Sequence, residues 1–114
     1  MTSQEKLEVI IETADEMKAE NIETVDVRNK TTVTDYHLIC SGNSDRHVQA
    51  IADKIEDKMR SIKQRALRGE GDRTGWVLQD YGDVVLHVML EEQRQFFDIE
   101  TLWKMAPIDE TAVV

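Results

Sequence analysis

The stretch YHLICSGN, residues 36–43, constrains the fold more than any other, because it predicts a strand that is apolar on both faces. A strand of this kind lies inside a sheet that other elements cover on each side. Successive side chains point to opposite faces, with Tyr36, Leu38 and Cys40 on one face and His37, Ile39 and Ser41 on the other.

A long amphipathic helix follows that strand. Its apolar residues recur at helical spacing from Val48 to Ala66, with Ser44 as a suitable N-cap and Gly69 as a suitable C′ residue. At the start of the chain, the Thr2–Glu5 capping box precedes another helical pattern. The full prediction is helix 3–19, strand 23–28, strand 36–43, helix 44–67, loop 69–75, strands 76–80 and 83–90, and helix 91–103.

This order, αββαββα, predicts a single α/β domain over residues 1–107, with 108–114 as a flexible tail. The strand–helix–strand arrangement from 36 to 80 predicts a right-handed parallel crossover. The segment 76–90 predicts an antiparallel hairpin. We therefore expect a mixed β-sheet of four to five strands packed with helices.

The hairpin carries an unusual pair of acids. A two-residue turn at Tyr81 and Gly82 would place Asp80 and Asp83 opposite each other at its neck. Their repulsion would cost about 0.5 kcal/mol. Two explanations stay open at this point: a turn-stabilising role, with Asp83 bonded to backbone amides, or docking of a basic partner.

Charge is distributed unevenly along a chain whose net charge is −9. Residues 1–26 and 80–114 each carry eight acids against two bases, a net of −6 each, while 27–79 carries ten bases against seven acids, a net of +3. This balance disfavours free nucleic acid as the main partner, because that binding depends on Lys and Arg. A basic protein surface is a better electrostatic match.

The compartment is predicted from three features of the sequence. No apolar run approaches the roughly 18 residues of a membrane span, and the N-terminus lacks a signal-peptide pattern. The single cysteine, Cys40, cannot form an intrachain disulfide. We expect a cytoplasmic protein without a membrane association.

No pattern for catalysis, metal or cofactor stands out. The three histidines, His37, His47 and His87, share no metal-ligand spacing. Cys40 is predicted to point away from His37, although His37 and His87 can share a sheet face. Neither a phosphate loop nor a dinucleotide fingerprint occurs. Asp80 and Asp83 lack the i, i+2 arrangement of a two-metal pair, so we predict no catalytic, metal or cofactor site.

Aromatic residues are few and gather late in the chain. Trp76 and Leu78 share one predicted strand face with Asp80, which is typical of an interface hot spot with a charged rim. The alternative is that both side chains cover helices. Phe96, Ile99 and Trp103 are predicted to share one stripe of the last helix.

Three segments resemble the ribosomal silencing factor family, which is also called the Iojap or RsfS type. They are TDYHLICSGNSDRHVQAIAD (34–53), GWVLQDYGDVVLHVM (75–89) and FFDIETLW (96–103), within a resemblance that runs from about residue 3 to 107. The resemblance implies a nucleotidyltransferase-like fold without catalytic carboxylates. It implies a translational repressor that binds the large-subunit ribosomal protein numbered fourteen and blocks joining of the subunits when nutrients are scarce.

Carried over to this sequence, the resemblance implies a partner-binding surface. Its predicted members are Trp76, Leu78, Asp80, Tyr81, Gly82 and Asp83, with Thr34, Asp35, Tyr36 and Arg94 nearby. A peripheral rRNA contact is a further expectation for the basic end of the long helix, at Lys58, Arg60, Lys63, Arg65 and Arg68.

Two alternatives to the repressor stay open. One is a nucleotide-binding enzyme with the same type of fold, which the absent carboxylate pair and phosphate loop disfavour. The other is a homodimer whose aromatic surfaces pair with each other.

Overall fold

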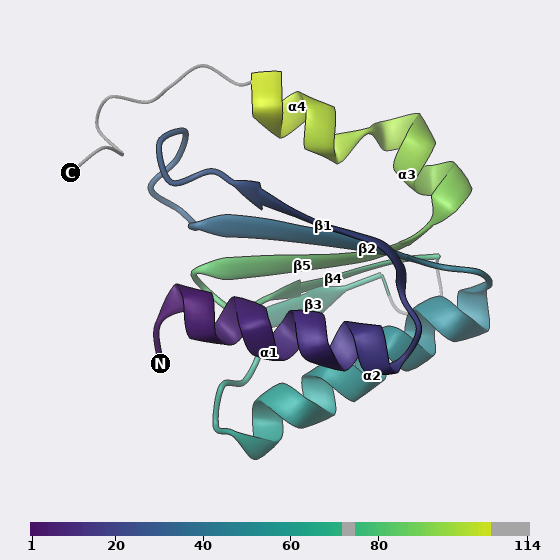
Figure 1. The fold of residues 1–114 in the computed structure, drawn as a ribbon, viewed down its shortest axis with the longest axis horizontal. Coiled ribbons are helices and arrows are strands. Elements are labelled where there is room, and N and C mark those ends of the chain that lie inside the picture. The colour runs from purple at the N-terminus through teal and green to yellow at the C-terminus, as the bar shows by residue number, and fades with distance from the viewer. Residues whose placement is uncertain (72–74, 106–114) are drawn as a thin grey trace.

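The computed structural model describes residues 1–71 and 75–105 (Figure 1). The predicted tail 108–114 lies outside the described residues. The elements in chain order are α1 (Ser3–Glu16), β1 (Glu20–Asp26), β2 (Tyr36–Gly42), α2 (Asp45–Ser61), β3 (Arg68–Glu70), β4 (Trp76–Asp80), β5 (Val84–Leu90), α3 (Glu91–Phe97) and α4 (Ile99–Met105).

The five strands form one mixed sheet in the order β1-β2-β5-β4-β3. β2 and β5 are parallel, and all other neighbours are antiparallel. All seven residues of β2 are buried, which confirms it as a central strand. The predicted mixed α/β fold is therefore correct.

The prediction that strand 76–80 runs parallel to β2 is wrong. The parallel partner of β2 is β5, with Tyr36 opposite Val84 and Gly42 opposite Leu90. β5 is buried along nearly its whole length, whereas β4 alternates between buried and half-buried residues. A strand that is apolar on both faces gains most at the centre of a sheet, so β5 lies next to β2 and β4 lies outside it.

Several element boundaries differ from the prediction. α2 ends at Ser61 and not at residue 67, because the chain turns into a positive φ of 62° at Lys63. The predicted loop 69–75 contributes the short edge strand β3. The predicted helix 91–103 is two helices, since Asp98 adopts a left-handed conformation with φ of 46°.

The sheet separates two helical layers (Figure 1). α1 and α2 cover one face, where Ile10, Leu38, Ile51 and Leu86 belong to the larger core cluster. α3 and α4 lie over the other face, where a smaller cluster is centred on Ile39. This division confirms the predicted alternation in β2.

Local sequence explains where the first two helices begin. The Thr2–Glu5 capping box is present in both directions at the start of α1. Ser44 caps α2 by accepting a hydrogen bond from the backbone N–H of His47. Gly42 permits the close approach of α2, because a Cβ there would lie 2.8 Å from the backbone of Val48.

Within the described ranges 1–71 and 75–105, every helix is too short or too polar to cross a membrane.

Candidate docking surface

The turn between β4 and β5 is centred one residue later than the sequence predicts. Tyr81 N–H donates to Val84 O at 2.9 Å, so Gly82 and Asp83 are the two central residues. Gly82 adopts φ of 89°, the conformation that type II′ hairpin turns favour at their first central residue. Asp80 pairs with Val85, so the predicted confrontation of Asp80 with Asp83 does not occur.

Both carboxylates of the turn bind groups within the chain. Asp80 accepts a hydrogen bond from Gly82 N–H at 2.8 Å, and its other oxygen lies 3.6 Å from Arg68 Nε. Asp83 accepts from Lys6 Nζ at 2.8 Å, and the same ammonium donates to Tyr81 O at 3.0 Å. The acids therefore stabilise the turn and fasten it to α1, but their partners differ from the prediction: Asp80 accepts from the turn amide, whereas Asp83 binds the ammonium of Lys6 and not backbone amides.

The start of β2 lies beside this turn. Asp83 O accepts hydrogen bonds from the N–H groups of Asp35 at 3.0 Å and Tyr36 at 3.1 Å. The structure thus brings the predicted 34–36 segment and the turn together. The side chains differ in access, because Thr34, Tyr36 and Tyr81 are buried while Asp35 and Asp83 are half-exposed.

Trp76 and Leu78 lie on the face of β4 that points away from α1 and α2. Both are half-buried, whereas Val77 and Gln79 between them are buried on the helical side. Trp76 contacts Phe97 of α3, with ring centroids 4.8 Å apart. Trp76, Leu78 and Phe97 line an open hollow of about 460 Å³ whose other walls are Glu70, Gly71 and Gln93. This hollow therefore lies between β4 and α3.

The last helical segment presents its aromatic residues differently from the predicted stripe. Phe96, which the predicted stripe includes, is 82% exposed. Its neighbour Phe97 packs against Trp76. The break at Asp98 shifts the helical phase, so Ile99 and Trp103 still reach the core side while Phe96 does not. Two adjacent phenylalanines in a helix cannot both face the same layer, which is the signal that the predicted stripe overlooked.

A hydrogen-bonded chain of rings lies beneath Trp76. Its indole Nε1 donates to His87 Nδ1 at 3.2 Å, and His87 Nε2 lies 3.0 Å from His37 Nδ1. Trp103 stacks on His37 with ring centroids 4.7 Å apart. Burial lowers the pKa of His37 to about 4 and that of His87 to about 3, so both imidazoles are neutral near pH 7.

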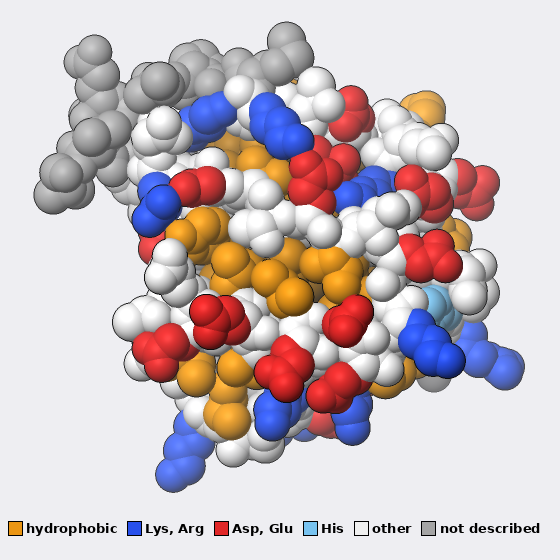
Figure 2. Space-filling view, viewed as in Figure 1, with side chains coloured by type: hydrophobic (Ala, Val, Ile, Leu, Met, Phe, Trp, Pro, Cys, Tyr) orange, Lys and Arg blue, Asp and Glu red, His pale blue; other side chains and the backbone are white. Residues whose placement is uncertain are grey.

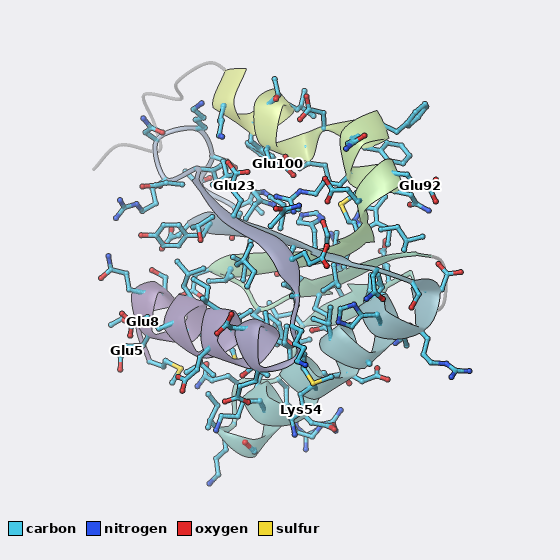
Figure 3. The ribbon with its side chains drawn as sticks, turned by 45° about the vertical axis from the view of Figure 1, so that its right-hand side comes forward. Glu5, Glu8, Glu23, Lys54, Glu92 and Glu100 are labelled. Carbon is cyan, nitrogen blue, oxygen red and sulfur yellow. The ribbon has the colours of Figure 1, made fainter. Side chains whose placement is uncertain are left out.

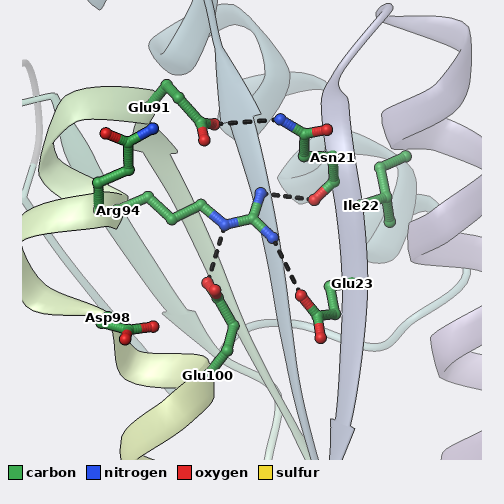
Figure 4. A pocket seen from close by; sticks show the side chains of 8 residues that line it. Asn21, Ile22, Glu23, Glu91, Arg94, Asp98 and Glu100 are labelled. Carbon is green, nitrogen blue, oxygen red and sulfur yellow. Dashed lines mark hydrogen bonds and ion pairs between the residues drawn. The ribbon is translucent and has the colours of Figure 1, made fainter.

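Arg94 follows the end of β5 that lies farthest from the turn, so the structure separates it from the predicted docking residues of the turn and of the 34–36 segment. Figure 4 shows the surroundings of Arg94. Its guanidinium is buried and donates to Asn21 O, to Ser41 Oγ at 3.0 Å and to Glu100 Oε1 at 2.8 Å. Glu23 Oε2 lies 3.6 Å from Nη2. Arg94 thereby joins α3 and α4 to β1 and β2.

A third carboxylate, Glu91, completes this arrangement. Glu91 accepts hydrogen bonds from Ser41 Oγ at 2.7 Å and from Asn21 Nδ2 at 3.2 Å, and these bonds hold its pKa below the usual range. Figure 3 places Glu23 and Glu100 in the space between β1 and α4, where both face Arg94. The open hollow of about 590 Å³ around Arg94 is therefore bridged by ion pairs.

The acidic composition is visible on the surface. Figure 2 shows acidic side chains on both sides of a hydrophobic band on the face that includes α1. Glu5 and Glu8 point outward from α1 (Figure 3). An acidic protein of this kind is attracted over a distance to basic surfaces.

The anchoring of the turn predicts a measurable loss of stability. Lys6→Met removes the partner of Asp83 and the donor to Tyr81 O, and the Lys6 side chain is only 14% exposed. We expect the free energy of unfolding in urea to fall by about 1–2 kcal/mol. The matched variant Lys54→Met, on the exposed side of α2 (Figure 3), should change it by less than about 0.5 kcal/mol. Equal effects would contradict the anchoring role.

The sequence and the fold of this chain are both similar to those of known proteins. Residues 1–114 match the family model described as "Ribosomal silencing factor during starvation". The chain is 39% identical to the ribosomal silencing factor RsfS of Bacillus subtilis over 109 residues, which cover 95% of this chain and 92% of that protein. It is 29% identical to "Mitochondrial assembly of ribosomal large subunit protein 1" of Mus musculus, covering 91% of this chain and 47% of that protein.

Solved structures agree. A crystal structure of a Chromobacterium violaceum protein superposes with a TM-score of 0.89 at 33% identity, covering 96% of this chain and 92% of that one. A Bacillus halodurans structure gives a TM-score of 0.80 at 36% identity, covering 88% and 94%. With the sequence matched over its whole length and the five-stranded mixed sheet shared, the chain belongs to the ribosomal silencing factor family.

Proposed function

We propose that this protein represses translation without performing chemistry, by occupying the face of the large ribosomal subunit at which the small subunit docks. The partner on that face is the large-subunit ribosomal protein numbered fourteen. The repressor acts in the cytoplasm when nutrients are limiting. Membership of the silencing factor family supports a ribosomal role. The observation that carries the proposal is the half-buried Trp76–Leu78 pair, whose strand leads directly into a rigid acidic turn.

The docking surface is defined here by its accessible members, Trp76, Leu78, Asp80, Gly82 and Asp83, with Asp35 beside them. Trp and a neighbouring aliphatic residue provide the contact that excludes water, and the carboxylates form the rim. Because Gly82 N–H and Lys6 already hold the two carboxylates, little conformational entropy is lost when a basic partner binds them.

The other predicted docking residues support this surface from within. Tyr81 is buried, and its hydroxyl donates to Gln79 Oε1 at 2.6 Å. Tyr36 and Thr34 are also buried beside the turn. We propose that these residues and Arg94 shape the fold around the docking surface and do not contact the partner directly.

The alternative of a nucleotide-binding enzyme receives no support from the turn, since Asp80 and Asp83 are both engaged in bonds within the chain. Two finer expectations remain proposals. The basic end of α2 grazes rRNA, although Arg60 already pairs with Glu56 and Asp57. A homodimer forms off the ribosome through the aromatic surface.

Mutation of the indole tests the docking surface. Trp76→Ala should weaken co-sedimentation with purified large subunits by about 2 kcal/mol, a roughly 30-fold rise in Kd. It should also restore joining of small subunits in a light-scattering assay. Leu102→Ala removes an exposed apolar side chain on α4, outside the docking surface, and should leave both readouts unchanged.

The thermal unfolding of each variant is measured alongside, so that a loss of folding is separated from a loss of docking. A folded Trp76→Ala variant that still blocks subunit joining would remove the function from this surface.

A further inference from the structure

We propose that His87 is a positioning residue, which fixes the indole of Trp76 on the docking surface and is itself oriented by His37. This inference rests on the proposed function, because it concerns how the docking surface is prepared for its partner. It stands on the hydrogen-bonded chain from Trp76 through His87 to His37.

The direction of each hydrogen bond follows from the donors. The indole Nε1 only donates, so His87 Nδ1 must be an unprotonated acceptor. In the neutral ring, the hydrogen is then on Nε2, which donates to His37 Nδ1. His37 in turn carries its hydrogen on Nε2. One tautomer of each ring is thus selected by the indole at the surface.

The last atom in this chain is unusual. His37 Nε2 is buried without a hydrogen-bond partner among the described residues. An unpaired buried donor costs free energy, and two apolar side chains of similar size would fill the same space without that cost. Packing alone therefore does not account for two histidines here. A fixed acceptor for Trp76 does.

The surroundings keep the acceptor available. Trp103 of α4 covers His37, and Asp80 of β4 is the carboxylate that acts on it, favouring its charged form. Lys30 brings an ammonium to the same region by donating to Trp103 O at 2.7 Å. Burial outweighs Asp80 and lowers the pKa of both rings, so Nδ1 of His87 stays unprotonated from pH 8 to pH 5.

A fixed indole changes docking through conformational entropy. Trp76 is held by the hydrogen bond below it and by Phe97 beside it, so it does not have to be ordered when the partner binds. Loss of the acceptor should weaken docking about fivefold, the effect of freeing one large side chain.

The experiment compares two substitutions in the full chain. His87→Leu removes the acceptor but keeps an apolar side chain, whereas His87→Asn places an amide oxygen close to the position of Nδ1. The indole N–H signals of the free protein are followed by ¹⁵N-resolved NMR, with Trp76→Phe identifying the Trp76 signal. Binding to purified large subunits is measured for the same samples.

We expect His87→Leu to shift the Trp76 indole signal, to speed its hydrogen exchange and to weaken docking about fivefold. His87→Asn should restore all three readouts. In the unsubstituted protein, the signal should be constant from pH 8 to pH 5 and should move only near pH 4 and below.

Three results would overturn the proposal: an unchanged indole signal in His87→Leu, an altered signal with unchanged docking although Trp76→Ala weakens docking, or no restoration by His87→Asn. Failure of the proposed function is recognised separately. In that case Trp76→Ala leaves docking unchanged, while the indole signal of the free protein still responds to His87→Leu.

Discussion

Replacement of Arg94 by alanine is expected to lower the free energy of unfolding by about 3–5 kcal/mol. The Arg94 side chain is only 7% exposed, and its removal leaves Glu100 without its cation and Ser41 and the carbonyl of Asn21 without a donor. The loss should appear as a lower midpoint in urea unfolding. It should be accompanied by faster hydrogen exchange in α3 and α4, which Arg94 joins to the sheet.

The control for this prediction is Arg46→Ala. Arg46 is exposed on the first turn of α2, so its removal should change stability by less than about 0.5 kcal/mol. If Arg94→Ala were as stable as Arg46→Ala but failed to bind large subunits, Arg94 would be a docking residue, as the family resemblance alone implies. It would then not be a residue that holds α3 and α4 on the sheet.

The second large effect is a loss of stability in mild acid. The pKa of His37 is about 4 and that of His87 about 3 in the folded protein, against about 6.5 in the unfolded chain. Between these values the unfolded state binds more protons, so stability is fully present above pH 6.5 and is lost as the pH falls. For two histidines the free energy of unfolding should be about 3–4 kcal/mol lower at pH 5 than at pH 7.

Urea unfolding at pH 7, 6 and 5 measures this dependence. The carboxylates with lowered pKa, Glu5, Asp26 and Glu91, lose their contribution mainly below pH 4.5, so they do not obscure it. The double substitution of His37 and His87 by asparagine should flatten the dependence. In the unsubstituted protein, ring proton signals of His37 or His87 that titrate near pH 6.5 would contradict the prediction.

The sequence predicts the central position of β2, because a strand that is apolar on both faces leaves no alternative. It does not predict which later strand joins β2. That choice depends on burial of both faces of β5. It is apparent only when the burial of nearly all residues of β5 is compared with the alternating burial of β4. The turn was misplaced by one residue because Gly82 is compatible with either central position, and the hydrogen bond from Tyr81 to Val84 decides between them.

The candidate site was predicted unevenly for a similar reason. Trp76, Leu78 and the acidic turn are close in sequence, so their shared strand face is readable from alternation alone. Arg94 connects α3 to Asn21 and Ser41, which are more than 50 positions away in the sequence, and no local sequence pattern predicts such contacts. The ring chain is intermediate: alternation places His37 and His87 on one face, but only the register of β2 and β5 brings them within hydrogen-bond distance.

The position of β5 between β2 and β4 affects how the chain acquires its structure. β2 ends at Gly42 and its neighbour begins at Val84, so some forty residues must be made before the sheet can close. Non-local pairings of this kind slow folding, and until they form, the apolar edge of β2 is open to other strands. A nascent chain that has not yet released β5 from the exit tunnel therefore has neither a finished sheet nor the β4–β5 hairpin, and it is most vulnerable to aggregation at this stage.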